Sequence, residues 1–399
     1  MKIIKNILRY LRTILFLPII LPVVIVILAI RPFIIIRFKR LPAERIGHYA
    51  TETDLYLCES EAGIHGPRVV DIFYQNTKDV CNKQLCKMWT RSKLNLFPSW
   101  WSMQLLQVFP LVFSKIPGGK KCIIPKTLMD THGLLNRTPS YLSFTPEEEK
   151  FGYKELERLG IPAGEPFLCF HARDPAYLSS RYLQSDQSYH NYRNADITNY
   201  LPAVEKLTNR GYYAVRMGSV VEKKLATENS KILDYANNGR TDFMDIFLSA
   251  KCKFFLCSTG GINSVPRIFR RPVINANSPL RVYMEPTIPY YVIFKKLWLH
   301  KEKRFMTFRE AFELYDDDYR GDYSEYGIEF VENTPGEIEE IAIEVDERLK
   351  GTWITSKEDE ELQKLFWSIF EKHHPHRFSG PTLARVGAAY LRQNRNLLG

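Results

Sequence analysis

The chain lacks most of the short motifs that indicate a cofactor, a metal or a nucleic acid. Its seven cysteines form no C-x-x-C pair, which argues against a thiolate metal site or a redox motif. Zinc-finger spacing, a basic region with heptads and an RNA-binding aromatic signature are all missing, so nucleic-acid binding is not expected. Neither G-x-G-x-x-G nor G-x-x-x-x-G-K-[ST] occurs, which leaves the usual dinucleotide and P-loop interpretations without support.

Internal repeats and low-complexity tracts are also missing. The 399 residues are 45% hydrophobic and 25% charged, which indicates two domains with buried cores plus appendages. The cysteines are odd in number and irregularly spaced, and Cys169 and Cys257 lie in apolar runs. They are expected to be small buried fillers in a reducing compartment.

The net charge of +10 is concentrated near the start of the chain. The residues concerned are Lys2, Lys5, Arg9, Arg12, Arg31, Arg37, Lys39 and Arg40. Because they flank a hydrophobic segment, anionic lipid explains them better than nucleic acid does.

That segment, residues 14–30, is almost unbroken in its apolar character but contains Pro18 and Pro22, and Pro32 follows it. A straight span needs about 20 apolar residues, and proline favours a kink. Basic residues on both flanks favour a kinked re-entrant or interfacial anchor over a plain span. A cleaved signal peptide is the third alternative, and residues 28–30 are a poor cleavage site for it.

The soluble part shows strands alternating with helices, which predicts a parallel sheet covered on both faces. The expected strands are residues 167–171, 212–217, 231–233, 253–257 and 272–275, and the expected helices are 197–210, 241–250 and 260–270. Earlier in the chain, strands are expected at 69–74 and 122–124 and a helix at 101–113. Capping boxes at Thr145 and Thr334 predict helices to about residues 159 and 350, and residues 383–398 are expected to form a terminal helix.

Ligands of an open parallel sheet bind beyond the carboxyl ends of its strands. His171, Arg173 and Asp174 follow the first strand, and Arg173 can grip a diphosphate with two N–H groups. A loop ion pair between Arg173 and Asp174 is the alternative. The next loop carries Arg193 and Asn194, either at an anion-binding helix start or in a solvated loop.

Two further strand ends carry candidate donor-binding residues. Arg216 and Gly218 follow the second strand, where Arg216 either neutralises a phosphate or pairs with Asp242 or Asp245. Ser258, Thr259, Gly260 and Gly261 follow the 253–257 strand. Small hydroxyls and glycines let a phosphate approach the backbone, and a plain tight turn is the alternative.

Two clusters invite a metal hypothesis. Asp316, Asp317 and Asp318 are hard oxygen ligands suited to Mg²⁺ or Mn²⁺, but they follow a helical stretch and are expected to be a solvated loop. His373, His374 and His376 are interrupted by Pro375 and are expected to be a surface turn. No metal ligand is therefore assigned.

The chain resembles bacterial glycosyltransferases associated with surface polysaccharides. The matching elements are residues 45–48 (RIGH), 54–57 (DLYL), 171–174 (HARD), 192–196 (YRNAD), 200–203 (YLPA), 216–218 (RMG) and 258–261 (STGG). A looser similarity runs to GDP-fucose-dependent transferases, which place an H-x-R element at the first strand of the donor domain, as His171-Ala172-Arg173 does here.

The resemblance implies an α/β fold of the GT-B type, a pair of Rossmann-type domains behind an N-terminal hydrophobic membrane anchor. The expected divisions are an anchor at residues 1–40, an acceptor-side domain at 41–160, a nucleotide-sugar domain at 161–380 and a terminal helix at 381–399 that crosses back to the first domain. No cofactor or metal is expected, because basic side chains stabilise the departing diphosphate.

The expected activity is transfer of a sugar from a nucleotide sugar to a lipid-linked or polysaccharide acceptor at the cytoplasmic face of the inner membrane, as in O-antigen or capsule synthesis. Arg173, with Arg193 or Arg216, would offset charge on the leaving diphosphate. His48 is the candidate base, with Glu52 and Asp54 in reserve; a structural histidine is the alternative. Other functional classes left open are a CDP-polyol phosphotransferase, a sugar-nucleotide epimerase and a non-catalytic scaffold.

Overall fold

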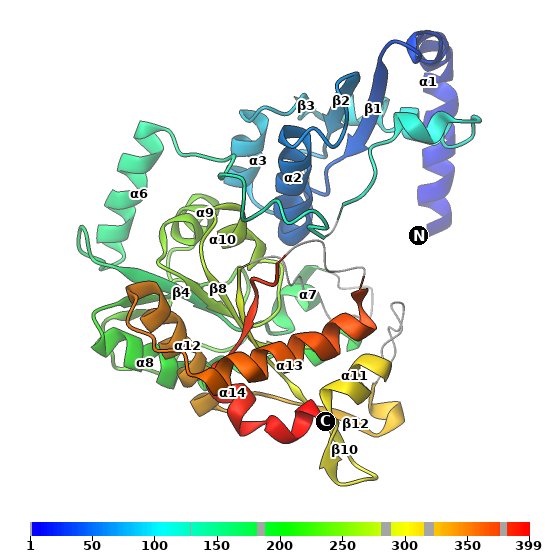
Figure 1. The fold of residues 1–399 in the computed structure, drawn as a ribbon. Helices are drawn as coiled ribbons and strands as arrows, with labels where there is room; N and C mark the ends of the chain where they lie inside the picture. Colours follow the sequence, from blue (N-terminus) through cyan, green and yellow to red (C-terminus); the bar gives the residue numbers. More distant parts are fainter. Residues whose placement is uncertain (1, 128, 182–187, 281–288, 315–322, 376–380) are drawn as a thin grey trace. The chain divides into compact units, whose positions relative to one another are not determined.

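The computed structural model describes residues 2–127, 129–181, 188–280, 289–314, 323–375 and 381–399 (Figure 1). The chain forms two compact units. Unit 1 comprises Met1–Leu128 and Tyr141–Ser143, and unit 2 comprises Met129–Ser140 and Phe144–Gly399. Both units contain a parallel sheet with helices packed on it, so the predicted α/β class with parallel sheets is confirmed.

Unit 1 is built on a three-stranded parallel sheet in the order β1-β2-β3. Its strands are β1 (Ile35–Arg40), β2 (Val69–Tyr74) and β3 (Leu96–Phe97). Its helices are α1 (Lys2–Ile30), α2 (Ile46–Glu61), α3 (Lys83–Thr90), α4 (Trp100–Leu106), α5 (Val108–Phe113) and the 3₁₀ helix η1 (Gly119–Cys122). The strand predicted at 122–124 is reduced to a single bridge between Ile123 and Phe38.

Side-chain alternation along β2 sends neighbouring residues to opposite faces of this sheet. On one face Phe73 packs edge-on against Tyr56 of α2, with ring centroids 4.6 Å apart, and the Tyr56 hydroxyl donates to Asp71 at 2.7 Å. On the other face Ile72 and Tyr74 join the apolar cluster that holds α1 and α5. The sheet is therefore covered on both sides.

Helix α1 contains Pro18 and Pro22 and ends at Ile30, before the Arg31-Pro32 break seen in the sequence. Its residues Ile20, Val24 and Ile27 are buried against β1 and α5. Within the described residues, no helix has the length and apolar character needed to cross a bilayer.

Unit 2 is built on a seven-stranded sheet in the order β13-β9-β8-β7-β4-β5-β6, and every pairing in it is parallel. The strands are β4 (Phe167–His171), β5 (Tyr213–Arg216), β6 (Ile232–Leu233), β7 (Phe255–Cys257), β8 (Val273–Ser278), β9 (Tyr291–Phe294) and β13 (Arg385–Val386). The first five confirm the strands predicted from apolar runs. Cys169 and Cys257 are fully buried in this sheet, as predicted, and Cys58, Cys122 and Cys252 are also buried, whereas Cys81 and Cys86 are only partly buried.

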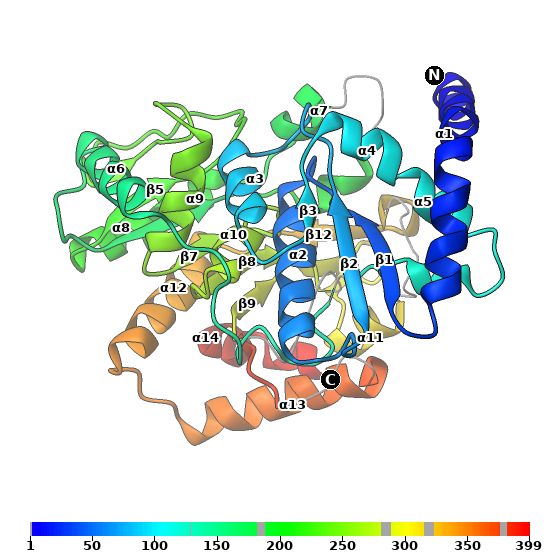
Figure 2. The ribbon, with the colours of Figure 1, turned by 90° about the horizontal axis from the view of Figure 1, so that it is seen from above.

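The helices of unit 2 lie along both faces of the sheet. They are α6 (Pro146–Arg158), α7 (Ala176–Arg181), α8 (Leu201–Asn209), α9 (Asp242–Lys251), α10 (Ser264–Ile268), α11 (Phe308–Leu314), α12 (Pro335–Lys350), α13 (Lys357–His373) and α14 (Ala388–Gln393), with 3₁₀ turns η2 (Ser188–Arg193), η3 (Ile197–Tyr200), η4 (Tyr323–Tyr326) and η6 (Arg395–Leu398). Figures 1 and 2 show α8 and α12 on one face and α9 and α10 on the other.

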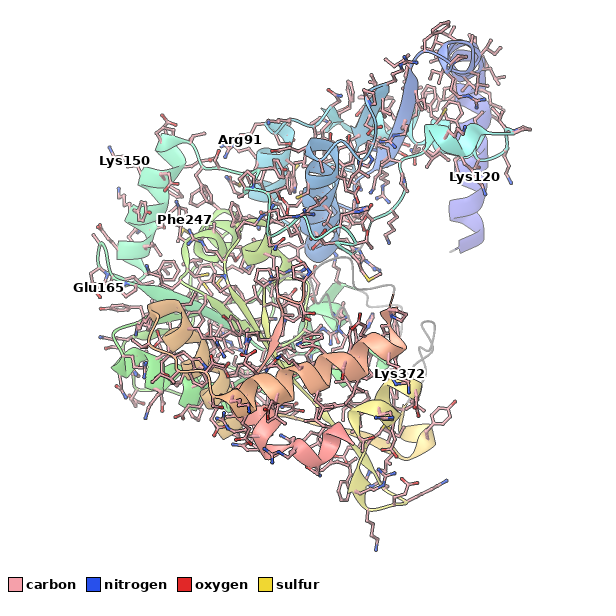
Figure 3. The ribbon with its side chains drawn as sticks, viewed as in Figure 1. Arg91, Lys120, Lys150, Glu165, Phe247 and Lys372 are labelled. Carbon is pink, nitrogen blue, oxygen red and sulfur yellow. The ribbon has the colours of Figure 1, made fainter. Side chains whose placement is uncertain are left out.

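Local sequence sets the ends of the long helices. Thr145 and Glu148 form the predicted reciprocal capping box of α6, and Thr334 and Glu337 do the same for α12. After α6 the chain turns at Gly160, which takes a φ of +96° that side chains rarely adopt. Helix α6 packs over α9, where the Phe247 ring of α9 lies against Gly152 of α6 (Figure 3). A Cβ added to Gly152 would stand only 2.2 Å from a carbon of that ring.

The prediction for the C-terminal segment of unit 2 is wrong in detail. Residues 383–398 do not form one helix: Arg385 and Val386 pair with β9, α14 follows, and η6 ends the chain. The strand forms because residues 385 and 386 complete an open edge of the sheet, a tertiary contact that the apolar pattern does not reveal. A small antiparallel sheet was not predicted from the sequence. Its strands, in spatial order, are β11 (Arg304–Phe305), β10 (Lys296–Leu299) and β12 (Ile328–Val331).

Candidate functional site

The strand order of unit 2 contains a topological switch point. From β4 the chain continues to β5 on one side of it and, after β6 and α9, to β7 on its other side. The connections that leave β4 and β7 therefore diverge from neighbouring carboxyl ends, where open α/β sheets bind ligands. Those connections carry His171, Arg173, Ser258 and Gly261, so the structure brings together two elements that the sequence separates by more than 80 residues.

Arg173 is held at this point by its backbone and by its side chain. Its N–H donates to Ser258 Oγ at 2.8 Å, which ties the two connections together. Its guanidinium donates to the carbonyl of His190 at 3.0 Å and to the side-chain oxygen of Asn194. These are neutral acceptors, so the positive charge has no counter-ion among them.

The alternative of an Arg173–Asp174 ion pair is wrong. The Asp174 carboxylate instead accepts the backbone N–H groups of Ala176 at 2.9 Å and of Glu222 at 3.1 Å. In the described part of the chain, no carboxylate forms an ion pair with Arg173. Burial first, and then the positive charge of Arg193, lower the Arg173 pKa to about 10.

Arg193 brings a second positive charge to the site from the end of η2. Its Nη2 donates a long hydrogen bond of 3.5 Å to the carbonyl of Thr259, and its Nε is buried without a partner among the described residues. Like charges in a partly buried site raise each other's free energy, and an anion bound between them lowers it. The two arginines therefore form a charge arrangement suited to a phosphate or diphosphate.

Lys295 is a third cation that sequence reasoning missed. It follows β9, is only 5% exposed, and donates through Nζ to the carbonyl of Asn194 at 2.5 Å. Glu332 lies 3.7 Å from Nζ, and burial, only partly offset by Glu332, lowers the Lys295 pKa. The sequence does show a lysine directly after the apolar run 291–294, which would have marked it as a strand-end residue. Its contact with Asn194 depends on the tertiary fold.

The Ser258–Gly261 turn is arranged differently from the predicted helix start. Helix α10 begins only at Ser264 and has five residues, because Ile262 and Asn263 form a turn that the Ser264 N–H closes by donating to the Gly261 carbonyl. The Thr259 hydroxyl and Ser278 Oγ lie 3.1 Å apart within hydrogen-bonding distance. Gly260 faces His171, and an added Cβ would stand 3.9 Å from Nε2.

His171 presents one ring nitrogen in a defined state. Its Nδ1 lies 2.9 Å from the carbonyl of Met217, which can only accept, so Nδ1 carries the proton. Nε2 is then an acceptor beside Gly260. Burial lowers the His171 pKa, which keeps the ring neutral. Gly218 is required nearby, because a Cβ there would stand 2.5 Å from the side chain of Val221.

The Arg216 side chain is buried and already has partners within unit 2. It is 1% exposed, donates to the carbonyl of Lys223 at 2.6 Å and pairs with Asp234 at 3.3 Å. The partners considered from the sequence, Asp242 and Asp245, instead contact Arg240. Because its charge is already balanced, Arg216 is better explained as a support for the loop after β5 than as a donor-binding residue.

The remaining predicted site residues lie in unit 1. Gly47 and His48 belong to the first turn of α2. His48 Nδ1 lies 2.9 Å from Glu52 Oε1 one helical turn later, and Lys39 and Lys126 approach the same carboxylate at 3.8 and 3.9 Å. This carboxylate orients the ring so that Nε2 is left to accept a proton.

Asp54 is fully buried, six residues after His48 on α2. Six residues correspond to 600° of helix rotation, so the two side chains leave α2 in different directions. Burial of Asp54 argues against direct contact with an acceptor. Glu52, by contrast, is the carboxylate that contacts His48.

The two clusters considered as metal ligands are described only in part. Asp316, Asp317 and Asp318 lie outside the described residues, as does His376. His373 ends α13, and His374 is buried against Phe312 and Phe370, so these two do not form the predicted surface turn. Elsewhere in the described chain, no three His, Cys, Asp or Glu side chains come together in a metal-binding arrangement.

Comparison with known proteins gives structural likeness without sequence likeness. No protein-family model matches the chain, and no curated protein matches its sequence. Among solved structures, E. coli ADP-heptose lps heptosyltransferase II is similar at 13% identity and a TM-score of 0.39, over 65% of this chain and 90% of that one. A family 9 glycosyl transferase from Veillonella parvula is similar at 9% identity and a TM-score of 0.39, over 66% and 86%. E. coli heptosyltransferase WaaC is similar at 9% identity and a TM-score of 0.31, over 65% and 93%.

Proposed function

We propose that the chain is a nucleotide-sugar-dependent glycosyltransferase whose donor diphosphate binds at the carboxyl ends of β4 and β7. The observation that carries the proposal is the pair Arg173 and Arg193. Both guanidiniums lie at the switch point, and no described carboxylate pairs with either. A protein that keeps two neighbouring arginines without counter-ions at a ligand-binding edge is built to receive an anion.

The same residues supply the electrostatic part of glycosyl transfer. As the bond between the anomeric carbon and the diphosphate breaks, the sugar becomes oxocarbenium-like and negative charge grows on the leaving phosphate. Arg173 and Arg193 would offset that charge, and Lys295 would hold Asn194 and thereby the Arg173 side chain in position. Because the two arginines would supply this stabilisation, the proposed reaction needs no metal ion or cofactor.

We assign the proton acceptor to His48. Its Nδ1–H to Glu52 leaves Nε2 with a lone pair, the arrangement that general-base catalysis by histidine requires. Lys39 and Lys126 lie 3.8 and 3.9 Å from the same carboxylate. The acceptor hydroxyl would therefore be bound by unit 1, in the two-domain GT-B arrangement. Replacement of His48 by alanine with turnover unchanged would remove this assignment.

The proposed setting is the cytoplasmic face of the inner membrane, with a lipid-linked or polysaccharide acceptor in cell-surface glycan synthesis. The basic residues around the apolar segment 14–30 support it, since they suit anionic lipid. O-antigen or capsule synthesis is the process this setting fits. A role in nucleic-acid binding is not part of the proposal.

The test is a thermal-shift and calorimetric screen of detergent-purified protein against UDP-, GDP-, ADP-, dTDP-, CMP- and CDP-linked compounds, with and without EDTA. A ligand that binds only folded protein raises the melting temperature. Arg173→Ala should lower the affinity about 10- to 150-fold, as expected for lost hydrogen bonds to a charged group. Arg158→Ala is the matched control, because Arg158 is exposed on α6 and pairs only with Glu155.

Each outcome has a defined meaning. A hit that depends on Arg173 and persists in EDTA supports the proposal and names the donor class. Release of CMP from a CDP-linked polyol would instead indicate the phosphotransferase alternative. No response to any nucleotide, with Arg173→Ala and Arg158→Ala behaving alike, would contradict the proposal and favour a non-catalytic scaffold.

A further inference from the structure

Helix α1 buries one narrow stripe and leaves the rest of its apolar surface uncovered. Ile20, Val24 and Ile27, at spacings of four and three residues, are buried on unit 1. Between residues 14 and 30 there is no charged or hydrogen-bonding side chain, yet seven large apolar side chains there are exposed: Ile14, Leu15, Ile19, Leu21, Val23, Ile25 and Val26. An uncovered apolar face of this length marks an interaction surface.

The buried stripe fixes how α1 lies on unit 1. It packs on Phe38 of β1 and on Phe109 and Phe113 of α5, where Phe38 and Phe109 stack with centroids 4.6 Å apart. Figure 2 shows α5 lying against α1. A helix whose buried stripe lies along a folded domain for about two turns, from Ile20 to Ile27, exposes only its outer face to lipid there, so it cannot also be surrounded by the hydrocarbon of a bilayer.

The neighbouring helix α4 extends the apolar surface with aromatic residues. Trp101 is 73% exposed and sits edge-on to Trp100 at 4.6 Å between ring centroids. Helix α4 packs on α5, which packs on α1. Tryptophan is enriched at membrane–water interfaces, where its ring meets the headgroups and acyl chains.

The charge around this surface has a single sign. Residues 1–43 contain eight Lys or Arg and no Asp or Glu, and residues 80–129 again contain eight Lys or Arg and no Asp or Glu. Lys115, Lys120 and Lys121 are exposed in the segment after α5. Arg31 joins that segment to the end of α1 by donating to the Gly118 carbonyl at 3.1 Å, and Figure 3 labels Lys120 beside α1.

We propose that the outer face of α1, with Trp101, Lys120 and Lys121, seats unit 1 on one leaflet of an anionic membrane without crossing it. The apolar face would enter the acyl boundary, and the lysines would meet anionic headgroups. A second copy of the chain is a poorer occupant, because a symmetric contact would bring two clusters of positive charge together. The inference concerns unit 1 alone and does not depend on the Arg173 site.

The test is flotation of the full-length protein with vesicles of phosphatidylcholine alone and of phosphatidylcholine mixed with phosphatidylglycerol. The wild type should bind the anionic vesicles more tightly, and added salt should weaken that binding. Lys120→Glu/Lys121→Glu should lower binding to anionic vesicles by at least about 30-fold, since each lysine near an anionic surface contributes about a factor of five. Lys357→Glu is the control, because Lys357 is exposed on α13 of unit 2.

The apolar contribution is tested with Ile19→Asn/Ile25→Asn, which changes two exposed positions of α1, against Ile354→Asn, which changes an isolated exposed residue of unit 2. The α1 variant should lose binding to both vesicle types while its circular dichroism and melting temperature stay those of the wild type. Alkaline carbonate should strip the wild type from the vesicles, since it does not span them.

Three results would overturn the inference. Resistance to alkaline carbonate would show a spanning segment. Equal binding by wild type and both lysine and α1 variants would place the lipid contact elsewhere. A wild-type dimer in sedimentation velocity, lost in the α1 variant while vesicle binding persists, would assign the face to a second copy. Loss of nucleotide binding in Arg173→Ala leaves this inference unaffected, so the two proposals fail separately.

Discussion

The ends of the neighbouring strands β4 and β5 carry the same residue type in two different roles. Arg216, the last residue of β5, is buried with a counter-ion, Asp234, and a backbone acceptor. Arg173, two residues past β4, donates to neutral acceptors and lies near another arginine. Balanced charge indicates that an arginine supports the fold, and unbalanced charge at a ligand-binding edge indicates that it receives an anion.

His171 and His48 also differ in the group that each one contacts. His171 and His48 each direct Nδ1 to an acceptor, a carbonyl for His171 and a carboxylate for His48. Burial lowers the pKa of His171 although the Met217 carbonyl acts in the opposite direction, and Nε2 is left as a hydrogen-bond acceptor for a ligand. The Glu52 carboxylate orients the His48 ring and leaves Nε2 with a lone pair, which suits a base.

The largest expected effect is on stability, from Arg216→Met. Removing one partner of a buried ion pair leaves Asp234 without its counter-ion and costs about 3–5 kcal/mol. Urea unfolding followed by tryptophan fluorescence measures the loss. Arg173→Met should cost far less or even stabilise, because it relieves repulsion with Arg193. Equal losses in the two variants would abolish the proposed difference between the strand ends.

Because Arg216→Met also changes the shape of a buried side chain, Asp234→Asn provides a second measure. It keeps an oxygen acceptor for the N–H groups of Leu225 and Arg216 but removes the charge. A loss of about 1–3 kcal/mol is expected from the charge alone. Nucleotide affinity of the folded Asp234→Asn protein should match that of the wild type.

An intermediate effect is expected from Arg173→Lys. Lysine keeps the charge but has no planar fork to hold a diphosphate in two places. Nucleotide affinity should therefore fall about tenfold, which is about 1.4 kcal/mol, less than for Arg173→Ala. Isothermal titration calorimetry with the nucleotide that gives the strongest thermal shift measures both. An affinity for Arg173→Lys as low as that for Arg173→Ala would show that geometry, and not charge, is what Arg173 supplies.

The smallest effect is the pH dependence that His171 adds to stability. Burial lowers its pKa, so around the ordinary histidine pKa of about 6.5 the unfolded chain binds a proton that the folded chain does not. Stability is therefore highest above that pH and decreases as pH falls through it toward the folded pKa. Urea midpoints from pH 8 to about pH 5 should show this slope in the wild type and a shallower one in His171→Asn, whose amide can still donate to Met217.

Asp245 titrates in the same range, because burial raises its pKa to about 6. A raised carboxyl pKa gives the opposite slope, with stability decreasing as pH rises through that value. The contribution is common to both proteins and cancels in the difference between them. Identical slopes for wild type and His171→Asn would show that the His171 ring is not held neutral by the fold.

Local sequence determined much of unit 2. Thr145 and Thr334 with glutamate three residues later fixed two helix starts, because a capping box satisfies backbone N–H groups within a few residues. The buried runs 167–171, 213–216 and 255–257 formed neighbouring parallel strands, since residues apolar on both faces must be covered by helices on both sides. Helix starts and buried strands depend mainly on residues close by in the sequence, so the local sequence pattern was enough to predict them.

The sequence by itself therefore determined that this is an α/β chain with arginine, serine and glycine at the ends of parallel strands and an apolar segment set among basic residues. Only the tertiary structure decided that Asp234 balances Arg216 and that Lys295 approaches Asn194. It also decided that residues 385–386 complete a sheet and that one stripe of α1 is buried. These outcomes join residues from distant parts of the chain. The free energy of such contacts depends on burial and on which charges meet, and neither is contained in the local pattern.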